Sequence, residues 1–111
     1  MRICLNMIVR DGIETIERSI ESARGLIDCW VILDTGSTDG TQAKIRELLA
    51  GVPGELHERA APSDGKPTAL GPARNEALEL ARKTLGAEDY ILLTAARQYV
   101  VIQDSRFKIQ E

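Results

Sequence analysis

Residues 30–41 read Trp-Val-Ile-Leu-Asp-Thr-Gly-Ser-Thr-Asp-Gly-Thr, an apolar run that ends on a carboxylate and continues through small polar residues. A helical pattern of apolar side chains follows, formed by Ala43, Ile45, Leu48 and Leu49. This stretch predicts a buried strand, a turn and a helix. In an open α/β sheet, ligands bind at the carboxyl ends of strands, where loops lead into helix N-termini.

The two carboxylates of this stretch have different predicted roles. Asp34 precedes the helix by too many residues to cap it, so we expect it to accept hydrogen bonds from a base or a ribose. Gly36 and Ser37 are small enough for the backbone to pass close to a ligand. Asp39 fits the N-cap, with Gln42 at N3 closing a capping box. The alternative is an ordinary strand-to-helix turn without a ligand.

The rest of the chain alternates between strand and helix patterns. Strands are predicted at residues 3–9, 29–33, 55–59, 90–93 and 99–102. Helices are predicted at about residues 13–27, 40–50 and 72–85, the last with Pro72 at its first position. Residues 60–70 are a predicted loop that could close over a ligand. The order predicts a single α/β domain over residues 1–111, with a three-layer, mostly parallel, Rossmann-like sheet.

Composition narrows the classes of function. The chain has 111 residues, 14 basic and 17 acidic, and a net charge of −3, which gives no reason to expect nucleic-acid binding. No apolar run is long enough to span a membrane, and no signal peptide precedes the first strand. Cys4 and Cys29 lie within apolar strand patterns, so we expect buried, reduced thiols and a cytoplasmic protein.

Three further side chains could carry chemistry. Arg74 lies in the first turn of a predicted helix, where a cation opposes the helix dipole, so a contact to a base carbonyl or a phosphate is favoured. A solvated surface arginine is the alternative. Asp11 is either a second carboxylate at the same sheet end or the N-cap of the first helix. His57 is interpreted as a surface residue of an edge strand, since no partner lies at metal-ligand spacing.

Three segments resemble successive motifs of the family 2 glycosyltransferases, namely residues 8–11 (IVRD), 31–41 (VILDTGSTDGT) and 73–77 (ARNEA). The resemblance covers at least residues 3–93. It implies a GT-A fold, the nucleotide-diphospho-sugar transferase-like sheet, which binds a nucleoside-diphosphate sugar. The implied activity is inverting transfer of the sugar, from a UDP-sugar in most members, to an acceptor hydroxyl.

The resemblance also implies roles for single residues. Asp34 would contact the base, usually uracil, and Arg74 would lie near the base or the diphosphate. Val9 and Asp11 would line the base pocket. Where the family often has Asn-Glu after its first strand, this chain has Asp11-Gly12.

One motif of the family is replaced. After its fourth strand the family has Asp-x-Asp, which holds the ribose and a divalent cation, Mn²⁺ or Mg²⁺. This chain has Ala95 and Arg97 at the two acidic positions, and neither side chain is a metal ligand. Arg97 could replace the cation by a bidentate phosphate contact, the site could be degenerate, or Arg97 could lie on the surface after a local register change.

Only residues 98–111 follow Arg97, whereas the family's acceptor-binding part and catalytic base lie beyond its Asp-x-Asp motif. The sequence therefore names no catalytic residue and predicts a truncated GT-A domain. An uncovered sheet edge or face would follow, which predicts either a homo-oligomer or a poorly soluble monomer. The alternative function is a degenerate, non-catalytic nucleotide-binding or structural domain. A receiver-like phosphoacceptor domain fits the length but lacks the acidic pair and the late lysine.

Overall fold

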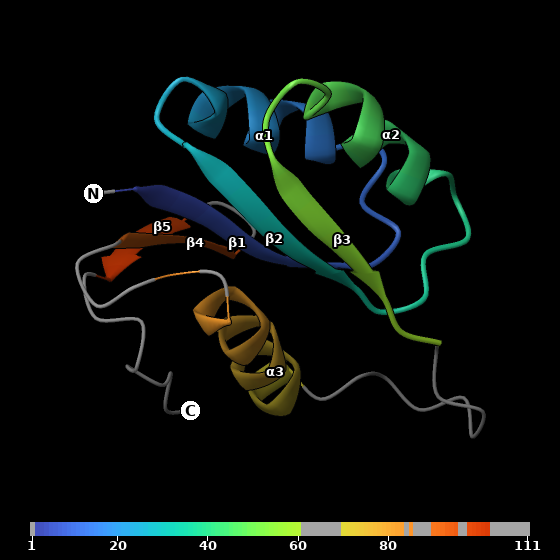
Figure 1. Cartoon of the computed structure of the whole chain (residues 1–111). Coiled ribbons are helices and arrows are strands. Elements are labelled where there is room, and N and C mark those ends of the chain that lie inside the picture. The colour runs from blue at the N-terminus through green and yellow to red at the C-terminus, as the bar shows by residue number, and fades with distance from the viewer. Residues whose placement is uncertain (1, 61–69, 84, 86–89, 96–97, 103–111) are drawn as a thin grey trace.

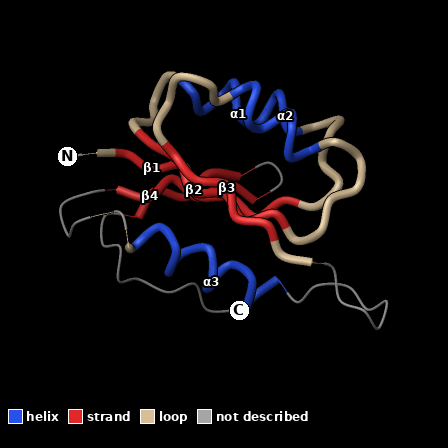
Figure 2. The backbone as a smooth tube through the Cα atoms, turned by 45° about the vertical axis from the view of Figure 1, so that its right-hand side comes forward, coloured by secondary structure: helices blue, strands red, loops and turns tan. Residues whose placement is uncertain are grey.

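A computed structural model of the chain describes residues 2–60, 70–83, 85, 90–95 and 98–102, and arranges them as one sheet between two layers of helix (Figure 1). The elements in chain order are β1 (Ile3–Val9), α1 (Ile16–Arg24), β2 (Cys29–Asp34), α2 (Thr41–Leu48), β3 (Gly54–Glu58), α3 (Leu70–Arg82), β4 (Tyr90–Ala95) and β5 (Gln98–Ile102). Helices α1 and α2 cover one face of the sheet, and α3 covers the other (Figure 2). The α/β prediction is confirmed, and the arrangement is compatible with a Rossmann-like fold.

The sheet has the strand order β3-β2-β1-β4-β5. Strand β1 pairs in parallel with β2 and with β4, β2 pairs in parallel with β3, and β5 is antiparallel to β4. The chain steps outward from β1 through β2 to β3 and then returns to the opposite side of β1. The strand order therefore reverses between β1 and β4, which is where open α/β sheets form their ligand crevice.

Helix α3 runs back across the sheet, so that its first turn lies at the end where β2 and β3 finish (Figure 1). We call this end the carboxyl edge of the sheet. The predicted loop at residues 60–70 leads from β3 to α3, and its residues 61–69 lie outside the described part of the chain.

Two groups of buried side chains hold the layers together. On the α1/α2 face, alternate residues of β1 and β2 pack against Ile20 of α1 and Ile45 of α2. On the α3 face, Cys4 and Cys29 pack against Leu78 and Ala81. These alternating contacts arise because successive side chains of a strand point to opposite faces.

Some predicted boundaries are wrong by a few residues. Helix α1 begins at Ile16 rather than near residue 13, since residues 11–15 form turns. Strand β2 extends one residue further, through Asp34. Helix α3 begins at Leu70, so Pro72 lies within its first turn and not at its first position. Within the described residues, no helix combines the length and the apolar character needed to cross a membrane.

Candidate functional site

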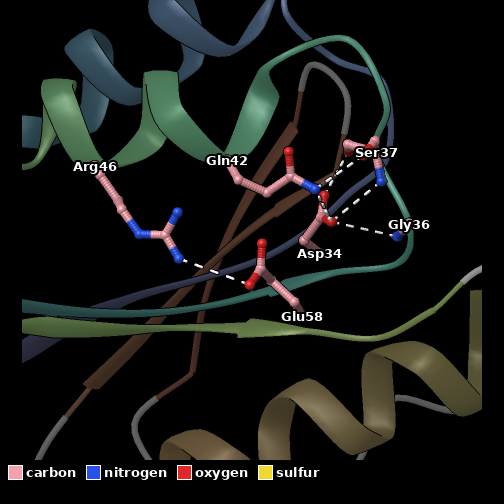
Figure 3. Close-up of polar contacts among 6 residues, drawn as sticks. All are labelled: Asp34, Gly36, Ser37, Gln42, Arg46 and Glu58. Carbon is pink, nitrogen blue, oxygen red and sulfur yellow. Dashed lines mark hydrogen bonds and ion pairs between the residues drawn. The ribbon is translucent and has the colours of Figure 1, made fainter.

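Asp34 is the central polar group at the end of β2, and its side chain is 1 % exposed. Its Oδ2 accepts hydrogen bonds from the backbone N–H of Gly36 (3.3 Å) and Ser37 (3.1 Å) and from Gln42 Nε2 (2.8 Å). Its Oδ1 accepts one from the Ser37 hydroxyl (Figure 3). An ionised carboxylate has about four acceptor positions, so these donors use most of its capacity. Asp34 therefore fixes the shape of the turn that follows it.

Gln42 and Asp39 do not form the predicted capping box. Gln42 donates to Asp34 and to the carbonyl of Ser37 (2.9 Å), both on the sheet side of the turn. The N-cap of α2 is Gly40, with φ of 93°, and no side chain caps the helix from that position. The prediction is wrong because Asp39 lies one residue too early for this role.

Asp39 instead joins two loops. Its Oδ1 accepts hydrogen bonds from the backbone N–H (3.0 Å) and the hydroxyl of Thr41, and its Oδ2 accepts one from the N–H of Ile13 (3.1 Å). The Thr41 hydroxyl bond, more than any other contact, holds the pKa of the Asp39 carboxyl below its usual value. Asp39 is therefore an anion that links the loop before α1 to the start of α2.

Asp11 makes a second link between the same loops. Its N–H donates to Ser37 Oγ (2.8 Å), and its Oδ1 accepts from the N–H of Thr38 (2.7 Å). Its φ of 49° lies in the left-handed region, which an aspartate tolerates better than most residues. The N-cap of α1 is Thr15, so the capping alternative for Asp11 is wrong.

Residues 10–15 and 35–40 thus form one unit, which we call the paired loops. Many of their backbone N–H groups donate hydrogen bonds within the protein. Besides those described above, the N–H of Gly12 donates to Thr41 Oγ1 (3.0 Å). A free helix N-terminus is an anion site only while its N–H groups are available. Before α1 and at the start of α2, the N–H groups of Ile13, Thr38 and Thr41 already have carboxylate acceptors.

The predicted site residues divide between the two faces of the sheet. Asp34 lies on the α1/α2 face, because its side chain meets Gln42 of α2. Arg74 is half-buried in α3, which covers the opposite face. Asp34 ends β2 at the carboxyl edge, and α3, which carries Arg74, begins at the same edge. The predicted residues of the two faces therefore approach one another at this edge.

Val9 and Ala95 occupy the strands on either side of the reversal. Val9 pairs with Asp34 across β1 and β2, and Met7 pairs with Thr94 across β1 and β4. Ala95, the last residue of β4, therefore lies at the same edge as Val9. Arg97 lies outside the described residues, so its three alternatives stay open.

A groove of about 390 Å³ lies between β3 and α3. It is lined by Leu33, His57, Glu58, Arg59, Glu76, Glu79, Leu80 and Lys83. An ion pair of 3.1 Å between Arg59 and Glu76 connects its two walls. The groove is lined by both acidic and basic side chains. In the described part of the chain, no three metal-ligating side chains come together.

The structure confirms the edge-strand position of His57 and the burial of the two cysteines. His57 is half-exposed on β3 at the edge of the sheet, and its Nε2 lies 2.9 Å from Glu55 Oε2. Cys4 and Cys29 are free and buried. Burial, with Cys29 beside it, raises the pKa of the Cys4 thiol well above its usual range.

Neither the models of known protein families nor the curated proteins contain a match to this chain. The resemblance to family 2 glycosyltransferases therefore stays a prediction from the three motifs.

Proposed function

We propose that the chain binds a nucleoside-diphosphate sugar at the carboxyl edge of the sheet, as a family 2-like glycosyltransferase with a GT-A-type fold. The reaction would transfer the sugar, with inversion, to an acceptor hydroxyl. One observation supports this most directly: the strand order reverses between β1 and β4, and Val9, Asp11 and Ala95 lie around that point. The motifs that suggested a nucleotide site thus coincide with the position that open α/β sheets use for ligands.

The internal hydrogen bonds favour one orientation of the ligand. The N–H groups of Ile13, Thr38 and Thr41 already donate to the carboxylates of Asp11 and Asp39, which add negative charge there. A diphosphate is therefore disfavoured beside the paired loops. We assign the base to the paired loops and the diphosphate to the side of Arg74, where a guanidinium can pair with phosphate.

The replaced Asp-x-Asp motif supports a site that does not depend on a divalent cation. Ala95 supplies no oxygen ligand, and an arginine at position 97 could offset the phosphate charge. The same replacement favours the second candidate, a nucleotide-binding domain without transferase activity, because a guanidinium cannot copy the multi-oxygen coordination of a cation.

Calorimetric titration with UDP, in the presence and absence of Mn²⁺, tests the binding proposal. We expect binding without metal, weakened at least tenfold in Arg74→Ala and in Arg97→Ala. Arg24→Ala is the matched control, because Arg24 is an exposed arginine at the last position of α1, the end remote from the carboxyl edge, and should leave binding unchanged. Absence of UDP binding under both conditions would overturn the proposal, and binding that requires Mn²⁺ would overturn its metal-independent form.

A UDP-release assay with UDP-sugars separates the two candidates. Release of UDP that is lost in Arg74→Ala supports the transferase, since water can replace the acceptor hydroxyl in a slow side reaction. Tight UDP binding with no release from any UDP-sugar supports the non-catalytic domain.

A further inference from the structure

Strand β3 presents one unpaired backbone edge among the described residues. It lies at the end of the sheet and pairs only with β2. The carbonyl of Pro53 and the N–H of Arg59 bond to β2, so the odd-numbered residues face that strand. By alternation, the N–H and C=O groups of Gly54, Leu56 and Glu58 point away from the sheet.

The side chains of β3 alternate in the same way. Leu56 packs against the core beneath α1 and α2, and Glu58 pairs with Arg46 of α2 at 3.7 Å. Glu55 and His57 point to the opposite face, where their side chains meet at 2.9 Å. Helix α3 packs on β1 and β2, and on this side of β3 a groove separates it from the strand.

We propose that β3 pairs antiparallel with β3 of a second copy of this chain, about a two-fold axis at Leu56. In this register Leu56 exchanges both backbone hydrogen bonds with Leu56 of the second copy. Gly54 does the same with Glu58. The two sheets then join into one, and a homodimer results.

Charge selects this register over its neighbours. With the axis at Leu56, each Glu55 lies directly opposite a His57, and facing side chains in such a pair have Cβ atoms about 4.5–5.5 Å apart. The imidazole N–H can then donate to a carboxylate of either copy. With the axis at Glu58, two glutamates would face each other, and His57 would face Arg59. Like charges directly opposite are destabilising.

The central contact is apolar. Leu56 is partly buried against the core, and pairing brings it against its counterpart on the α1/α2 face. Charged residues on an edge strand usually discourage pairing with other chains. The charged side chains of β3 disfavour pairing with most other strands, but Glu55 and His57 complement each other when a second β3 pairs with the first. They therefore favour another copy of the chain as the partner.

Sedimentation velocity over a range of protein concentrations tests the proposal. The native chain should show a monomer–dimer equilibrium. Glu58→Pro removes an outward N–H without touching the bonds to β2, because proline is tolerated where the N–H faces away from the ladder. It should weaken dimerisation at least about tenfold, since two hydrogen bonds are lost per dimer. Glu58→Ala is the matched control: it removes the ion pair to Arg46 but keeps the N–H, and it should still dimerise.

Charge variants test the register without altering the backbone. His57→Glu places glutamates opposite each other and should also weaken dimerisation. The double variant Glu55→Lys with His57→Glu restores opposite charges and should restore dimerisation. These two variants test the proposed dimer even if Glu58→Pro fails to fold.

A native chain that stays monomeric at every concentration would overturn the proposal. A dimer that is unchanged in both Glu58→Pro and His57→Glu would do so as well, because it must use another surface. Circular dichroism confirms that each variant is folded before it is compared.

Discussion

Asn6 in β1 donates a 3.0 Å hydrogen bond from its side-chain amide to the carbonyl of Ala77 in α3, and a second of 3.0 Å to the carbonyl of Val31 in β2. Asn6 is 2 % exposed, so these bonds lie within a buried layer. The amide thus ties one strand, its neighbour and the helix above them, and it fixes α3 over the sheet with its first turn at the carboxyl edge.

Asn6→Leu should lower the free energy of unfolding by about 2 kcal/mol, because two buried hydrogen bonds are lost while the branched shape of the side chain is kept. Urea denaturation followed by the fluorescence of Trp30 measures the change. Ser22→Ala is the control: Ser22 is exposed on α1, where its hydroxyl donates to the Ser19 carbonyl, and the change should alter stability by less than about 0.5 kcal/mol. Equal stability of Asn6→Leu and the native chain would contradict this assignment.

Gly54→Ala should destabilise the fold by about 1–3 kcal/mol. A Cβ built at Gly54 would lie 2.3 Å from three ring atoms of Trp30, whose Nε1 donates to the Val52 carbonyl and so resists displacement. Circular dichroism during thermal unfolding measures the loss.

Two comparisons sharpen this test. Gly25→Ala should be nearly neutral, because nothing lies within 4 Å of its Cβ position and its φ of −73° suits alanine. In the double variant of Trp30→Leu and Gly54→Ala, the combined loss should be smaller than the sum of the single losses. Additive losses would show that the ring does not cause the strain.

Asp39→Asn should reduce the loss of stability in acid. The pKa of the Asp39 carboxyl is lowered in the folded state from its usual 3.8, so the anion stabilises the fold above that pH. This contribution is lost as the pH falls through the lower, folded-state pKa. Thermal unfolding of the native chain and Asp39→Asn between pH 2 and pH 6 tests this. Parallel pH profiles for the two proteins would be inconsistent with the expected role.

Cys4 should resist alkylation by iodoacetamide at pH 8 in the folded protein. Burial raises the pKa of its thiol, and the thiolate is the reactive form. Mass spectrometry of the Cys4 peptide should show fast labelling only in urea. Labelling of the native protein at the rate of a free thiol would contradict the packing of Cys4 beneath α3.

The sequence predicted the layers better than the turns. The apolar run of β2 and the helical spacing of Ile16, Ile20 and Ala23 follow from local periodicity, and the structure confirms both. Leu78 of α3 was not among the predicted residues, although it is fully buried. Its burial depends on Cys4 and Cys29 in the facing strands, which no periodicity within α3 reveals.

The sequence correctly predicted that polar residues of the candidate site lie at the ends of strands. It did not predict their hydrogen-bond partners. Asp39 satisfies the local pattern of an N-cap, yet Ile13 is its partner 26 residues away. Thr38 and Thr41 were not singled out, although they bond to Asp11 and to Gly12. Such contacts depend on two loops meeting in space, and local sequence carries no signal for that meeting beyond the abundance of short hydroxyl side chains.

The paired loops should open together. Because Asp11 and Asp39 each bridge residues 10–15 and 35–40, the segment after β1 cannot open without the segment after β2. Their amides should therefore exchange with deuterium in a single cooperative event, and not loop by loop. Any molecule that docks there meets a surface that is already ordered, so little conformational entropy is lost on association.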